Sequence, residues 1–145
     1  MIEEFEGLSK AEQKLLLQAP AIVSLIASIG NGKIDQWKKI DAIKLAHLKT
    51  FTAPPSLIPY YKEVDKTFKH DFQLYEKIYT PINDASAALL QNKIDLINNV
   101  IAKLEDEFAF ALLASLLNYA EHVKKAYRGL VPNFVFPFPI FGLTG

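Results

Sequence analysis

An uncharged run over residues 15–32 constrains the fold of this chain more than any other feature. Its 18 residues are near the minimum length for a membrane span. Pro20 and several serine, asparagine, glutamine and glycine residues interrupt the run, however, so its apolar part is too short to cross a bilayer. We expect a buried central helix of a soluble bundle and no integral membrane segment. The remaining chain must then cover this helix.

Composition excludes several classes of function. The 145 residues fit one domain. The 16 basic residues balance 16 acidic ones and Arg128 is the single arginine, which argues against a nucleic-acid partner. Because the chain has no cysteine, it forms no disulfide, no catalytic thiol and no cysteine-held metal site. Residues 1–4 lack a signal-peptide pattern, so we expect a cytoplasmic location.

The first predicted helix opens at Ser9 and extends to about Ile29. Ser9 and Glu12 have the spacing of a capping box, in which each side chain bonds the backbone N–H of the other residue. Pro20 removes a backbone donor and should kink or split the helix. Residues 30–32 (Gly-Asn-Gly) tolerate left-handed backbone and should end it.

The second predicted helix covers residues 36 to about 50, with Asp35 as its N-cap. It is amphipathic. Its apolar side carries Trp37, Ile40, Ile43 and Leu48, and its basic side carries Lys38, Lys39, Lys44 and Lys49. Because Asp35 and Asp41 interleave with the lysines, we expect the basic side to be a solvated surface rather than a contact for nucleic acid or acidic lipid.

Three further helices follow a proline-rich connection at residues 52–59. The third carries an aromatic stripe at spacings of three and four residues, which predicts a core face: Tyr61, Val64, Phe68, Phe72, Tyr75 and Tyr79. Pro81 ends it, and the fourth helix begins near Asn83 or Asp84. A helix running on to Arg128 is too long for a domain of this size, so we place a break at residues 103–106. The fifth helix, residues 107–127, is apolar on most sides and should be largely buried.

The C-terminal segment, residues 129–145, differs from the rest of the chain. Its three prolines forbid a regular helix or a central strand. Its four phenylalanines disfavour exposure to water, and they are the candidate partner-binding or packing residues: Phe134, Phe136, Phe138 and Phe141. We expect the segment to be extended, and to pack either across a groove between helices of its own chain or against a second copy or another protein.

These patterns together predict an all-α protein. It is a single-domain helical bundle of about five to seven helices, with a helical core over residues 9–128 and an extended Pro/Phe-rich tail over residues 129–145. No strand is expected.

A family resemblance rests on residues 22–35, which read Ile-Val-Ser-Leu-Ile-Ala-Ser-Ile-Gly-Asn-Gly-Lys-Ile-Asp. This segment resembles the helix–turn–helix of the TerB-like (tellurite-resistance associated) family. The resemblance implies an all-helical fold and a metal-sensing or scaffolding role in stress response. Asn31 stands where the family has an acidic residue, and Lys38 or Lys39 stands where it has a glutamate. The resemblance therefore implies the fold more strongly than metal binding.

The sequence supports no firm metal site. Reading Gly32 as the glycine of a calcium loop puts too few oxygens at the ligand positions and Lys38 where a glutamate belongs, so the turn is not an EF-hand. None of the three histidines has a ligand partner one turn away on the same helix face. We assign no metal site. The candidate ligands, if folding gathers them, are Asn31, Asp35 and His122.

No catalytic motif is present: the chain has no nucleophile elbow, no phosphate-binding loop and no dinucleotide fingerprint. The leading hypothesis is a non-enzymatic helical interaction or scaffold module, TerB-like in fold, with no cofactor. Its partner is an unknown protein or a second copy. Two alternatives stay open, a metal-responsive stress protein and a carrier of a small apolar ligand held between the third helix and the tail.

Overall fold

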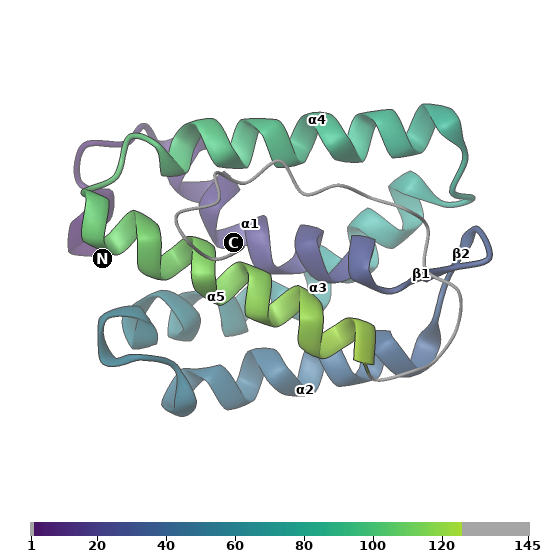
Figure 1. Cartoon of the computed structure of the whole chain (residues 1–145), viewed down its shortest axis with the longest axis horizontal. Coiled ribbons are helices and arrows are strands. Elements are labelled where there is room, and N and C mark those ends of the chain that lie inside the picture. Colours follow the sequence, from purple (N-terminus) through teal and green to yellow (C-terminus); the bar gives the residue numbers. More distant parts are fainter. Residues whose placement is uncertain (1, 126–145) are drawn as a thin grey trace, which may run out of the picture.

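The structure is a computed structural model that describes residues 2–125. Within them five α-helices pack together as a single, mostly helical domain, which confirms the predicted fold class (Figure 1). In chain order the elements are η1 (Glu3–Phe5), α1 (Lys10–Ala27), β1 (Ile29–Gly30), β2 (Lys33–Ile34), α2 (Gln36–Thr52), η2 (Pro55–Leu57), α3 (Ile58–Tyr79), α4 (Asp84–Ile101) and α5 (Asp106–Lys125). The predicted tail, residues 129–145, and the expected extension of the fifth helix to Tyr127 lie outside the described residues.

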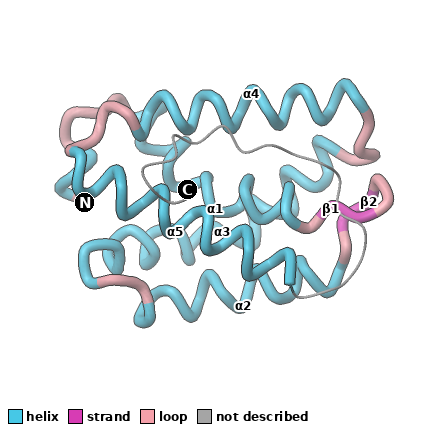
Figure 2. The backbone as a smooth tube through the Cα atoms, in the orientation of Figure 1, coloured by secondary structure: helices cyan, strands magenta, loops and turns pink. Residues whose placement is uncertain are grey.

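Helix α1 is the buried centre of this bundle, as its uncharged sequence predicts. It packs against α3, α4 and α5, and Figure 2 shows α1 and α3 enclosed between the outer helices α4 and α2. Every residue from Ala19 to Ala27 is buried. The predicted capping box is present, with Ser9 and Glu12 bonding each other's backbone N–H. None of the described helices is both long and apolar enough to span a membrane.

Pro20 lies inside α1 without splitting it. A proline in a helix interior cannot donate to the carbonyl four residues earlier, and its ring pushes that carbonyl aside. Here that carbonyl belongs to Leu16, which is fully buried. The hydroxyl of Tyr60, from α3, donates to it at 2.6 Å. The neighbouring helix thus supplies the hydrogen bond that Pro20 removes, and the helix continues to Ala27.

A short antiparallel hairpin follows α1, where the sequence predicted only a helix stop. Ile29 pairs with Ile34 and Gly30 pairs with Lys33. The two central residues, Asn31 and Gly32, have positive φ of 53° and 75°, as a type I′ turn requires. The expectation of no strand is wrong at this point, and α1 ends at Ala27 rather than near Ile29, because the last residues of the uncharged run pair with the next segment instead of continuing the helix.

Helix α2 is rotated relative to the prediction. Four of its large apolar side chains point outward: Trp37 is 69% exposed, Phe51 62%, and Ile40 and Leu48 each 45%. Ile43, also predicted on the apolar side, is partly buried against the core. The small residues Ala42 and Ala46 face inward instead and are fully buried. Helices α3 and α5 fill the interface with large aromatic rings, so α2 fits there only with small side chains, and the hydroxyl of Tyr119 reaches the carbonyl of Ala42 at 2.6 Å.

Most of the lysine side of α2 packs against neighbouring helices, so the expectation of a solvated basic surface is wrong for Lys38, Lys39 and Lys49. Lys38 has no exposed surface, and burial lowers the pKa of its ammonium group below the ordinary lysine value. The ammonium groups of Lys39 and Lys49 lie over the rings of Phe72 and Tyr61, at 5.9 and 5.5 Å from the ring centroids. The lysine stems pack on aromatic faces of α3. Of the four lysines, Lys44 is the exposed one.

The remaining predicted elements are confirmed. All six residues of the aromatic stripe on α3 are buried. Asn83 and Ser86 form a capping box at the start of α4. The helix is interrupted between Ile101, the end of α4, and Asp106, the start of α5. There the Glu105 carboxylate accepts hydrogen bonds from the backbone N–H of Glu107 and Phe108 at 3.0 and 3.1 Å. The predicted acidic start of the fifth helix is therefore an N-cap.

Removing the Tyr60 hydroxyl should destabilise the fold through Leu16. We expect Tyr60→Phe to lower the free energy of unfolding by about 1–3 kcal/mol, because a buried carbonyl loses its donor. In a Pro20→Ala background the loss should be smaller, since the restored backbone N–H at position 20 reaches the same carbonyl. Urea denaturation of the original protein, the two single variants and the double variant measures this coupling. As the control, Tyr119→Phe should cost the same in both backgrounds, and an equal penalty for Tyr60→Phe in both would contradict the assignment.

Alkaline pH should unfold the protein through its buried tyrosines. Burial raises the pKa of Tyr75 to about 12, with the nearby Asp71 carboxylate contributing, and burial also raises the pKa of Tyr79. Above pH 10 the unfolded state loses protons that the folded state keeps, so stability falls as pH rises. Between pH 10 and 12, Tyr75→Phe should reduce this fall by up to about 1.4 kcal/mol per pH unit. Urea denaturation at several pH values measures it, and identical slopes for the two proteins would refute it.

Candidate functional site

The three candidate metal ligands occupy separate places in the fold. Asn31 is the exposed turn residue of the hairpin. Asp35 is the N-cap of α2, as predicted, and its carboxylate accepts from the backbone N–H of Lys38 at 3.0 Å. His122, on α5, lies with its Nε2 2.9 Å from the Asp41 carboxylate on α2. Among residues 2–125 no group of three or more histidine, aspartate or glutamate side chains is placed to hold a metal ion.

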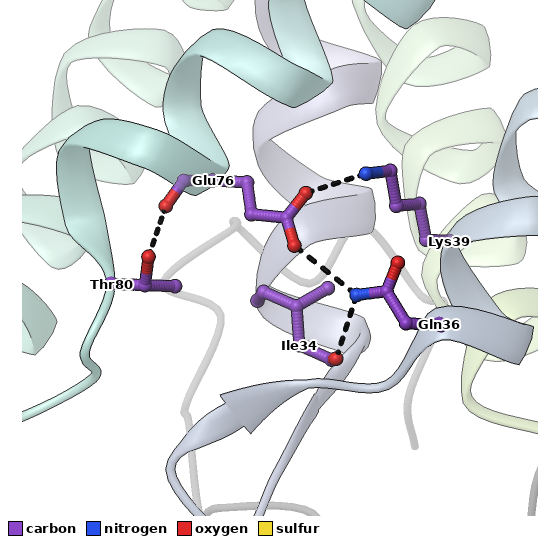
Figure 3. Close-up of polar contacts among 5 residues, drawn as sticks. All are labelled: Ile34, Gln36, Lys39, Glu76 and Thr80. Atoms are coloured by element: carbon purple, nitrogen blue, oxygen red, sulfur yellow. Dashed lines mark hydrogen bonds and ion pairs between the residues drawn. The ribbon is translucent and has the colours of Figure 1, made fainter.

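A polar cluster joins the hairpin to the ends of α2 and α3 (Figure 3). The Glu76 carboxylate accepts from Lys39 Nζ at 2.7 Å and from Gln36 Nε2 at 3.2 Å. Gln36 also donates to the Ile34 carbonyl, and Thr80 donates to the Glu76 carbonyl. Figure 3 shows the Lys39 and Gln36 side chains turned toward the Glu76 carboxylate, so these polar groups bond within the fold and join α2 to α3.

The outward face of α2 is the surface that the rotated helix creates. We call it the outer stripe, and it consists of Trp37, Ile40, Lys44, Leu48 and Phe51, all exposed. Successive members are three, four, four and three residues apart, so they form one continuous row along the helix. The sequence signal that would have predicted this orientation is the pair Ala42 and Ala46. Their four-residue spacing places two small side chains on one helix face, which is the close-packed inner face.

Two histidine–carboxylate pairs border the outer stripe. On the α5 side Asp41 pairs with His122, and on the α3 side His47 lies 3.2 Å from the carboxylate of Asp65. The His47 ring also meets the Phe51 ring edge to face, with centroids 6.4 Å apart. The apolar row is thus flanked by polar contacts that hold α2 to its neighbours, and Lys44 supplies the charge within it.

A pocket of about 570 Å³ opens where α4 ends and α5 begins. Its floor is apolar and is formed by four buried residues, Ile101, Leu104, Ala109 and Leu113. Asn98, Ala102 and Phe110 also line the pocket. Asp106 and Glu107, from the first turn of α5, bring acidic groups to its rim. Its volume falls within the range of sites that hold small apolar molecules. This is not the position expected for a carrier pocket, which the sequence placed between the third helix and the tail.

The hydroxyls of the three most deeply buried tyrosines all bond within the core. The Tyr61 hydroxyl hydrogen bonds with Ser115, while those of Tyr60 and Tyr119 donate to backbone carbonyls. Burial raises the pKa of all three hydroxyls well above the ordinary tyrosine value. These neutral, buried hydroxyls therefore link helices to one another.

Comparisons with known proteins add no relative: no family model, no curated protein and no solved structure matches this chain. The TerB-like resemblance therefore stays a prediction from the sequence. The residues that carry it fold as the end of α1, the hairpin and the N-cap of α2. The candidate packing residues Phe134, Phe136, Phe138 and Phe141 lie outside the described residues.

The outward orientation of Trp37, the single tryptophan of the chain, can be tested by fluorescence. Because its side chain is largely exposed, we expect red-shifted emission and acrylamide quenching close to that of a free tryptophan derivative. Urea should change the emission maximum little. Blue-shifted emission that resists acrylamide in the folded protein would show that the outer stripe is covered, and would contradict the orientation described for α2.

Proposed function

We propose that this chain is a non-enzymatic helical interaction module and that the outer stripe of α2 binds its partner. The observation that carries the proposal is the exposure of four large apolar side chains in one row, with Trp37 and Phe51 more than half exposed. Exposed apolar side chains occur singly on most proteins, whereas several aligned on one face of a helix are typical of a protein-binding surface.

The support beneath the stripe favours binding. Tyr119 bonds the backbone of α2 at Ala42, and the Lys39–Glu76 ion pair holds its first turns against α3. The row is therefore fixed before a partner arrives, and binding does not have to order the backbone. Aromatic anchors on a rigid helix are the kind of residue that contributes most to affinity in protein interfaces.

Lys44 at the midpoint of the stripe indicates the chemistry of the partner. If two copies paired through this face about a twofold axis at its centre, the two Lys44 ammonium groups would meet, which is unfavourable. A helix with apolar residues on either side of an acidic one matches the row better, since its carboxylate would lie against Lys44. We therefore propose a different protein as the partner rather than a second copy. The TerB-like resemblance, which implies a scaffolding role, agrees with this class of function.

A second candidate, a carrier of a small apolar ligand, is favoured by the pocket between α4 and α5. Its apolar floor and its volume of about 570 Å³ suit such a molecule. The metal-responsive alternative has no comparable observation in its favour among the described residues.

A pair of helical peptides tests the proposed function. Both carry apolar residues spaced to meet Trp37, Ile40, Leu48 and Phe51, and they differ only in a central glutamate or lysine. We expect the glutamate peptide to bind more tightly, by about fivefold, in titration calorimetry, since an interfacial ion pair of this kind contributes about 1 kcal/mol. Lys44→Glu should reverse the preference. Trp37→Ala should weaken binding of either peptide by about 2 kcal/mol.

Leu89→Ala on α4 is the matched control. Leu89 is also an exposed large apolar residue, at 55%, but it lies off the stripe. The three variants should keep the unfolding free energy of the original protein within about 0.5 kcal/mol, because they change exposed positions. The proposal is wrong if neither peptide binds, if Lys44→Glu leaves the preference unchanged, or if Leu89→Ala weakens binding as much as Trp37→Ala.

A further inference from the structure

The pocket between α4 and α5 combines an apolar floor with an acidic rim. Leu104 and Leu113 belong to the buried core and form part of the floor. Asp106 and Glu107 contribute carboxylates at the mouth. An occupant must therefore be apolar over most of its surface and must not bring a negative charge to the mouth, which would be repelled. A fatty acid, with its carboxylate at the mouth, fits this site poorly.

We infer that the occupant is the C-terminal segment of the same chain, with phenylalanine side chains from residues 134–141 inserted in the pocket. Between Gly129 and Gly145 this segment has no aspartate, glutamate, lysine or arginine. Its neutral, aromatic composition matches what the floor and the rim require. This site lies apart from the outer stripe of α2, so the inference goes beyond the proposed function and does not depend on it.

The segment is long enough to reach the pocket. The described chain ends at Lys125, the last residue of α5, and the pocket lies near the first turns of the same helix, at Ala109. Sixteen residues of α-helix rise about 24 Å. An extended chain covers about 3.3 Å per residue, so residues 126–134 alone can span about 30 Å. Phe134 and the phenylalanines after it are therefore within reach, even if the chain does not take the shortest path back along α5.

The local sequence of the segment suits burial in a groove. Phe136 and Phe138 each precede a proline, which favours extended backbone at both positions. In a strand-like extended chain Phe134, Phe136 and Phe138 then project to the same side. Pro132, Pro137 and Pro139 have no backbone N–H, so burying this stretch leaves fewer donors without partners than burying an ordinary sequence would.

Engineered disulfides test the inference in the full-length chain, which has no cysteine of its own. Ala102→Cys lies in the exposed part of the pocket lining and is paired with Phe136→Cys in the tail. The control pairs Phe136→Cys with Thr52→Cys, an exposed position at the end of α2. Under mild oxidation we expect the first pair to form an intramolecular disulfide at least about tenfold faster than the control, because docking raises the local concentration of the two thiols. Mass spectrometry of the intact protein and its peptides measures both rates.

A second measurement uses a neutral apolar dye, Nile red, and does not require the cysteine variants to fold. The triple variant Phe134→Ala/Phe136→Ala/Phe138→Ala should take up several-fold more dye than the original chain, because its pocket is no longer filled. Equal disulfide rates for the two cysteine pairs would overturn the inference. Disulfide-linked dimers in place of monomers would assign the pocket to the tail of a second copy. Equal dye uptake by the original chain and the triple variant would show that the phenylalanines do not fill the pocket, and would also overturn the inference.

Discussion

The hydrogen bond from Tyr60 to the Leu16 carbonyl is the interaction on which the arrangement of the helices depends. From Leu15 onward helix α1 is apolar on nearly every side and must be buried, yet Pro20 leaves one of its carbonyls without a donor where water has no access. Helix α3 supplies the donor and is thereby fixed in register against α1. The hydroxyls of Tyr61 and Tyr119 then join α3 to α5 and α5 to α2. Three buried hydroxyls thus fix the register between neighbouring helices, which apolar packing alone would leave less well defined.

Much of this fold could be predicted because its signals are local. The capping boxes at Ser9 and Asn83 need only residues three apart, and the aromatic stripe of α3 needs only a repeat of three and four residues. The break near Glu105 was visible for the same reason, since acidic residues gather where a new helix starts. Each of these features is decided within one or two turns of chain.

The parts that could not be predicted depend on what lies across an interface. The inner face of α2 is set by the rings of α3 and α5, which leave room for alanines and lysine stems but not for Trp37. The Asn31-Gly32 pair suits a helix end and a hairpin turn equally well, and the pairing of Ile29 with Ile34 decides between them. The same limit applies to the site. Asp35 and His122 looked available as ligands, but the folded chain uses one as a cap and the other in an ion pair with α2. The outer stripe becomes visible only once the inner face is known.

Native-state hydrogen exchange followed by NMR tests this account most directly, because it ranks the helices by the free energy needed to open them. Amides of α1 from Val23 to Ala27 should exchange only through global unfolding. Amides of α2 should exchange through a smaller opening, since α2 lies at the edge of the bundle and its inner face buries mainly alanines and lysine stems. Exchange of the α1 amides at the rate of α2 or faster would contradict the claim that a buried α1, completed by Tyr60, is the centre on which the other helices assemble.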